Sequence, residues 1–119
     1  FFWFHTFSIW IMYFLMTYIC FQAIPETSHL SISDGLFLLV LGGIGMVIPT
    51  PGGVGSYHAI VMIGLSVLGV GTIVLSENGD PSNPALLFPT IVHIAQTLVA
   101  IIMGFIGLLV LFLSKKKQS

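Results

Sequence analysis

Residues 49–58, with the sequence PTPGGVGSYH, interrupt an otherwise apolar stretch in the middle of this chain. The apolar runs beside this break, residues 36–48 and 56–71, would form helices of about 20 and 24 Å, whereas the hydrocarbon core of a bilayer is roughly 30 Å thick. Unpaired backbone N–H and C=O groups cost several kcal/mol in hydrocarbon, so such a break survives only inside protein or beside a water-filled cavity. The break is therefore where we expect a binding site.

The composition indicates an integral membrane protein. Hydrophobic residues make up 56% of the 119 residues and charged residues only 6%, against about 25% charged residues in a typical soluble domain. The net charge of −1 and the absence of a basic patch exclude a nucleic-acid partner. The sequence contains a single cysteine, Cys20, no metal-ligand spacing and no Walker motif, so we predict neither a metal nor another cofactor.

The expected fold is all-α and polytopic. Residues 1–24 and 86–113 carry no formal charge, and each run is long enough to cross a bilayer. These two full spans flank residues 36–71, which we expect to form a re-entrant helical hairpin broken at residues 49–55. Two complete but thin spans are the alternative for the same stretch, and the short apolar runs favour the hairpin.

Two polar connectors, residues 25–35 and 72–84, are expected to lie outside the hydrocarbon, and Ser33 or Asp34 is expected to cap the helix that follows the first. The chain opens at Phe1 inside a hydrophobic stretch. We therefore expect it to be the C-terminal part of one transmembrane domain, with the helices that precede it as partners.

The distribution of lysines predicts the sidedness. Residues 115–117 are the only Lys or Arg residues, and neither connector holds any. Positively charged segments next to a span stay in the cytoplasm, so the tail at residues 114–119 is predicted to be cytoplasmic and both connectors external. A re-entrant hairpin starts and ends on one face and satisfies this arrangement.

The chemistry of the break favours an anion. Gly52, Gly53 and Gly55 can adopt positive φ, which turns consecutive N–H groups toward one point. Ser56 is expected to be the N-cap of the following helix, whose first turn carries a partial positive charge suited to a phosphate or carboxylate. The predicted headgroup site consists of these residues and the neighbouring side chains: Gly52, Gly53, Gly55, Ser56, Tyr57 and His58. The alternative is a tight turn between two packed helices.

Residues 48–55, Ile-Pro-Thr-Pro-Gly-Gly-Val-Gly, resemble the proline–glycine signature of the lysylphosphatidylglycerol synthase transmembrane region, the flippase-like family. The order of connector, short apolar run, signature, short helix and long final span is similar to the C-terminal part of that domain. The chain departs from the pattern at His58, because members of the family often have an acidic residue three positions after the last signature glycine.

The resemblance implies a multi-pass protein of the bacterial inner membrane that houses an anionic phospholipid or related lipid and translocates it. The aminoacyl-transferring domain of the synthases is not in this chain, so no enzymatic activity is expected. The expected partners are the membrane lipid and the preceding helices, with homo-oligomerisation left open. A non-transporting membrane scaffold or accessory domain of a lipid-modifying system is the alternative function.

Polar side chains inside the apolar runs are further candidates. An ionisable residue at membrane depth, such as His58, is a functional hypothesis by default, although the positive end of a helix disfavours its imidazolium form. The last span carries a stripe of polar and small residues that favours close helix packing, with cavity lining as the alternative. The stripe comprises His93, Gln96, Ala100, Gly104 and Gly107. A serine-hydrolase dyad of Ser56 with either histidine is disfavoured, because Ser56 and His58 do not face each other on one helix.

Overall fold

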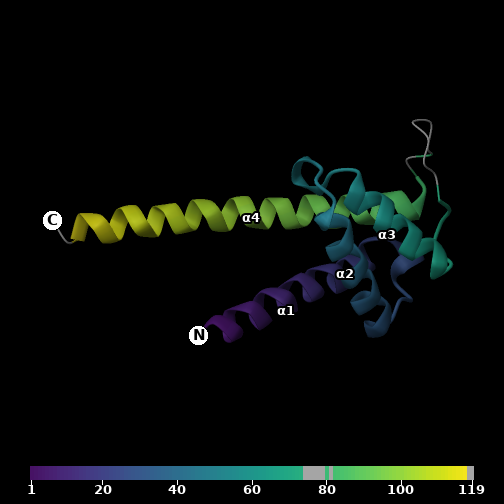
Figure 1. The fold of residues 1–119 in the computed structure, drawn as a ribbon, viewed down its shortest axis with the longest axis horizontal. Helices are drawn as coiled ribbons and strands as arrows, with labels where there is room; N and C mark the ends of the chain where they lie inside the picture. Colours follow the sequence, from purple (N-terminus) through teal and green to yellow (C-terminus); the bar gives the residue numbers. More distant parts are fainter. Residues whose placement is uncertain (74–79, 81, 118–119) are drawn as a thin grey trace.

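The computed structural model describes residues 1–73, 80 and 82–117, and every regular element in this part of the chain is a helix, which confirms the all-α prediction. Figure 1 shows two long helices, α1 and α4, that meet at one end of the molecule and diverge toward the two termini. The elements are α1 (Phe2–Cys20), the short 3₁₀ turns η1 (Phe21–Ala23) and η2 (Pro25–Thr27), α2 (Ile32–Val47), the 3₁₀ turn η3 (Pro51–Gly53), α3 (Ser56–Val67) and α4 (Pro84–Lys117).

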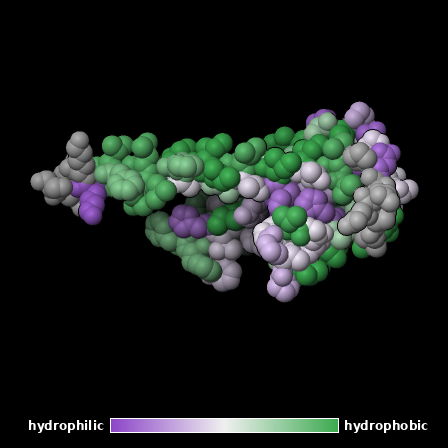
Figure 2. Space-filling view, turned by 90° about the horizontal axis from the view of Figure 1, so that it is seen from above, coloured by the Kyte–Doolittle hydropathy of each residue, from purple (hydrophilic) through white to green (hydrophobic). Residues whose placement is uncertain are grey.

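Two helical stretches are long and apolar enough to cross a membrane. They comprise 22 residues from Phe2 to Ala23 and 32 residues from Pro84 to Lys115. The C-terminal half of α4 exposes nearly all of its large apolar side chains, and Figure 2 shows this apolar surface running along the helix. Helix α4 continues through Lys117, past the predicted end of the span, because lysine is a good helix former. Residues 118–119 of the predicted tail lie outside the described residues.

Helices α2 and α3 form an antiparallel pair that packs through glycines. A Cβ added at Gly42 would lie 2.7 Å from the ring of Tyr57, and one at Gly64 would lie 2.9 Å from Leu38. Residues early in α2 therefore meet residues late in α3, and the helix ends meet at the break. The chain leaves α2 after Val47 and enters α3 at Ser56, so the helix break was predicted correctly.

The start of α2 corrects the sequence analysis. The helix begins at Ile32 rather than at residue 36, and its N-cap is Ser31, not Ser33 or Asp34. Asp34 is instead the third helical residue, and its carboxylate accepts the Ser31 backbone N–H at 2.8 Å while the Ser31 hydroxyl accepts the Asp34 N–H. This reciprocal capping box satisfies two helix-end donors at once, and for that reason the helix begins earlier than the apolar run.

The end of α3 is also earlier than expected. The helix ends at Val67 rather than at residue 71, because Gly69 and Gly71 have φ of +79° and +70° and cannot continue it. The Val70 N–H donates to the Leu65 carbonyl at 2.8 Å and closes the last turn, as glycine-terminated helices commonly do. The second connector follows, and residues 74–79 and 81 of it lie outside the described residues.

The core lies where all four helices meet, close to the connectors. Phe21 and Phe88 are fully buried there with ring centroids 5.3 Å apart, and Leu38, Leu65 and Val92 pack in the same cluster. Hydrogen bonds of the Asn83 side chain also connect two elements at this end of the molecule. Asn83, which is 8% exposed, donates to the Thr72 carbonyl at 2.7 Å and accepts the Ala85 N–H at 3.2 Å, so it ties the exit of α3 to the start of α4.

Candidate functional site

The backbone of the break has the predicted conformation. Gly52, Gly53 and Gly55 have φ of +63°, +73° and +91°, a region that side chains with a Cβ rarely adopt. However, the Gly53 N–H donates to the Thr50 carbonyl at 3.0 Å, and the Val54 N–H donates to the Pro51 carbonyl at 3.3 Å. The turn thus uses these two N–H groups internally, which leaves fewer donors for a ligand than the sequence analysis expected.

Ser56 does not cap α3, contrary to the sequence analysis. The N-cap is Gly55, whose positive φ keeps it out of the helix, and Ser56 is the first helical residue. The Ser56 hydroxyl shares a 2.7 Å hydrogen bond with the Thr50 hydroxyl and donates to the Gly53 carbonyl at 3.3 Å. Its described partners include no histidine, so the serine–base contact of a hydrolase is not formed in this part of the chain.

A cavity of about 940 Å³ lies between α1 and α4, beside the break. Its volume is at the upper end of the roughly 300–1,000 Å³ of small-molecule sites. Helix α2 also contributes to the wall, while Gly52 comes from the break and Tyr57 from the start of α3. The lining residues are His5, Ser8, Ile9, Trp10, Met12, Tyr13, Met16, Thr17, Leu38, Leu39, Gly42, Gly43, Met46, Gly52, Tyr57, His93, Gln96, Thr97, Val99, Ala100 and Met103.

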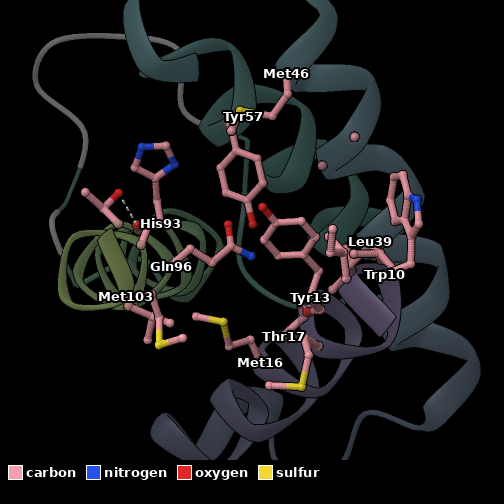
Figure 3. Close-up of a pocket in the computed structure, with 18 of the residues that line it drawn as sticks. Trp10, Tyr13, Met16, Thr17, Leu39, Met46, Tyr57, His93, Gln96 and Met103 are labelled. Atoms are coloured by element: carbon pink, nitrogen blue, oxygen red, sulfur yellow. Dashed lines mark hydrogen bonds between the residues drawn. The ribbon is translucent and has the colours of Figure 1, made fainter. Parts of the chain in front are cut away.

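Three polar side chains from three helices form what we call the polar centre of the cavity. Figure 3 shows the polar ends of Tyr13, Tyr57 and Gln96 pointing toward one another. Among the residues drawn in Figure 3, these three side chains make no hydrogen bond with one another. Two phenol hydroxyls and a carboxamide offer both donors and acceptors to a bound group. The lining residues that the structure describes include no Lys, Arg, Asp or Glu, and Tyr13, Tyr57 and Gln96 carry no formal charge themselves.

The rest of the cavity wall is mostly apolar and rich in methionine. Met16 and Met103 lie on the side of the cavity opposite Met46 in Figure 3. Methionine side chains are flexible and adapt to irregular apolar shapes. A wall of this kind suits a hydrocarbon chain better than a rigid polar ligand.

The structure divides the residues predicted for the headgroup site. Gly52 and Tyr57 line the cavity, whereas Gly53, Gly55, Ser56 and His58 lie in the same turn or helix start without lining it. The residues of α1 that line the cavity, such as Tyr13, Thr17 and Met16, were not predicted as site residues. The aromatic residues spread along residues 1–24 were the only available signal for this wall.

The stripe on α4 is also divided. His93, Gln96 and Ala100 line the cavity, so the less favoured alternative, cavity lining, describes this part of the stripe. A Cβ added at Gly104 or Gly107 would meet no described atom within 4 Å. The close helix packing expected at these two glycines is therefore not present within the described residues.

Two histidines from different helices meet beside Tyr57. The ring centroids of His58 and His93 are 5.3 Å apart, and those of Tyr57 and His93 are 5.5 Å apart. The Nδ1 atoms of both histidines are buried and have no hydrogen-bond partner among the described residues. Leaving a buried polar atom unpaired costs about 1–3 kcal/mol, so this histidine pair calls for a physical explanation.

Comparison with known proteins identified no matching family model, no similar curated protein and no similar solved structure. The sequence signature at residues 48–55 and the geometry of the cavity are therefore the two bases for a functional proposal.

Proposed function

We propose that the chain belongs to a polytopic protein of the bacterial inner membrane that binds an anionic phospholipid or related lipid and moves it across the bilayer. The observation that carries this proposal is the cavity of about 940 Å³ between two helices that are long enough to cross a membrane. The resemblance of residues 48–55 to the flippase-like family supports the same function. No step of the proposal requires an enzymatic reaction.

The lengths of the helices support a re-entrant hairpin. Helices α2 and α3, with 16 and 12 residues, span about 24 and 18 Å, against about 51 Å for the 34 residues of α4. Figure 1 shows the turn between α2 and α3 beside the first half of α4, and Gly52 shares the cavity with Met103. The lysines at the end of α4 favour a cytoplasmic C-terminus, with the hairpin entering from the other face.

The proposed lipid would lie with its polar group at Tyr13, Tyr57 and Gln96 and its hydrocarbon along the methionine-rich wall. Its chains would leave between α1 and α4, which diverge toward their free ends (Figure 1). Backbone that is irregular at membrane depth is tolerated where it lines a cavity, which is the position of Gly52.

The proposal is tested by native mass spectrometry of the purified chain in detergent and by a translocation assay with a fluorescent anionic phospholipid in proteoliposomes. Gln96→Leu and Tyr13→Phe remove polar groups from the polar centre, and we expect each to reduce retained lipid about 10-fold, the effect of one lost hydrogen bond of about 1.4 kcal/mol. Tyr18→Phe is the matched control, because Tyr18 packs between Phe14 and Phe21 and does not line the cavity. Equal lipid retention in all four proteins would contradict the proposed site.

The second candidate is a non-transporting scaffold, and the internal hydrogen bonding of the turn favours it. Gly53 and Val54 donate within the turn, and Ser56 bonds to Thr50, as expected of a purely structural connection. A wild-type chain that retains lipid but leaves the translocation rate at the level of empty liposomes would support this second candidate. Faster translocation that is lost in Gln96→Leu would support the first.

A further inference from the structure

The cavity proposed for an anionic lipid has no fixed positive charge. Its lining contains neither Lys nor Arg among the described residues, and the lysines of the chain lie at the far end of α4. An anion moved from water into a low-dielectric site needs a counter-charge or several strong donors, because its desolvation is costly. A transient positive charge on the wall would meet this need.

We infer that His58 and His93 form a site that binds one proton between them, and that this proton supplies the counter-charge for an anionic lipid headgroup. The role as a counter-charge for a lipid headgroup rests on the proposed function, whereas the shared-proton site does not. In the neutral pair both buried Nδ1 atoms lack a partner within the described chain. A solvent proton added to one Nδ1 creates an N–H donor that the lone pair of the other Nδ1 accepts, and no other bond is broken.

The geometry suits a single shared proton. The neutral rings make no N–H···N bond with each other, but their centroids are only 5.3 Å apart, so a ring rotation that accompanies protonation could bring the two Nδ1 atoms into hydrogen-bond contact. Two protons on rings this close would place like charges side by side in an apolar environment, so the pair titrates as a unit and takes up one. The ring of Tyr57 lies 5.8 Å from that of His58 and 5.5 Å from that of His93, within the roughly 6 Å at which an aromatic ring attracts a cation.

The charge is expected to reside mainly on His93. His58 is the third residue of α3, where the positive end of the helix dipole opposes a further positive charge. His93 is on α4 rather than in the first turn of α3, and it lines the cavity, so a charge there faces the ligand. His58 does not line the cavity and acts through His93, which makes it a positioning residue.

The other titratable groups near the pair are few. Tyr57 comes from α3, while His5, Tyr13 and Cys20 come from α1. Helix α2 places no titratable residue near the histidine pair, because its single titratable residue, Asp34, lies in its exposed first turn. Helix α4 contributes none besides His93 before the lysines at its end. Within the described residues no carboxylate competes for the proton.

The first test is a nitrogen NMR titration of the histidine-labelled chain in detergent between about pH 8 and pH 5, the range in which histidine ordinarily titrates. We expect His58 and His93 to take up one proton together. Uptake of two independent protons by the pair, or of none, would overturn the inference. This measurement needs no lipid, so it decides the proton site even if the proposed function fails.

The second test measures how lipid retention depends on pH, using a synthetic anionic phospholipid and a zwitterionic one. Protonation of the pair should raise the affinity for the anionic lipid roughly 5-fold or more, and by reciprocity that lipid should raise the midpoint pH of the pair above its value without lipid. His58→Leu removes the acceptor that holds the proton on His93 and should weaken the pH dependence, whereas His58→Gln keeps an acceptor oxygen and should restore part of it. Identical pH dependence in wild type and His58→Leu would overturn the coupling. Absence of lipid at every pH would instead refute the proposed function.

Discussion

Single glycines on α2 decide how closely the hairpin packs. A Cβ added at Gly45 would lie 2.9 Å from the Cα of Tyr57, and backbone atoms cannot move aside as a flexible side chain can. A Cβ added at Gly43 would come no closer than 4.0 Å to Trp10, an ordinary contact distance. The two positions lie on the same helix, yet only one of them faces α3.

We therefore predict that Gly45→Ala destabilises the chain by about 1–3 kcal/mol through overpacking against α3. Gly43→Ala is the matched control and should be neutral or stabilising by up to about 1 kcal/mol, because alanine is the better helix former. Thermal unfolding in detergent, followed by circular dichroism, measures both variants. Equal melting temperatures for the two variants would contradict the close packing of α2 against α3 at Gly45.

At the scale of elements, the capping box sets where α2 begins. The Ser31 hydroxyl accepts the Asp34 N–H and the Ser31 backbone N–H donates to the Asp34 carboxylate, whereas the Ser33 hydroxyl bonds to that of Ser31 and to no helix-end N–H within the described residues. We expect Ser31→Ala to cost about 1 kcal/mol of stability, the usual cost of losing an N-cap. Ser33→Ala is the control and should have a smaller effect. A loss of stability in Ser33→Ala as large as that in Ser31→Ala would contradict this assignment of the cap.

The same capping box predicts an acid dependence. The Ser31 hydroxyl and backbone N–H donate to the Asp34 carboxylate and lower its pKa below the ordinary 3.8. Because the folded-state pKa is below the unfolded one, the contribution of the carboxylate is fully present above about pH 4 and is lost as pH falls through the lowered value. The wild type should lose stability across this acidic window more steeply than Asp34→Asn, in melts recorded over a pH series.

At the scale of the whole molecule, the position of the turn between α2 and α3 distinguishes the re-entrant hairpin from two thin spans. A re-entrant turn stays at membrane depth, whereas the turn of two complete spans reaches the cytoplasmic face. Val54 is 62% exposed in this turn, so its side chain can carry a reporter without disturbing the core. In a Cys20→Ala background, Val54→Cys should resist a membrane-impermeant thiol reagent from the cytoplasmic side.

Ser28→Cys and Ser82→Cys, one in each connector, are the controls for that labelling experiment. Both should react from the external side only, because neither connector carries a positive charge. Rapid cytoplasmic labelling of Val54→Cys, with the two connector cysteines external, would establish two thin spans in place of the hairpin.

The local features of the chain could be predicted from the sequence because each follows from the chemistry of neighbouring residues. The scarcity of charge and the long apolar runs predicted an all-helical protein with two helices of membrane-spanning length. The prolines and glycines of residues 49–55 predicted the helix break, and Gly52, Gly53 and Gly55 have the positive φ that their missing side chains permit. The helix start at Ile32 was missed, because the reciprocal bonds of Ser31 and Asp34 were not recognised as a capping box.

What only the tertiary structure decided is which helix faces meet. Tyr13, Tyr57 and Gln96 come from three helices, and His58 and His93 from two, so no local pattern links them. Helical periodicity assigns a residue to a face of its own helix, but the neighbour of that face depends on how the helices cross. The sequence by itself therefore determined the elements and the break, whereas the polar centre and the histidine pair exist only because α1, α3 and α4 converge around one cavity.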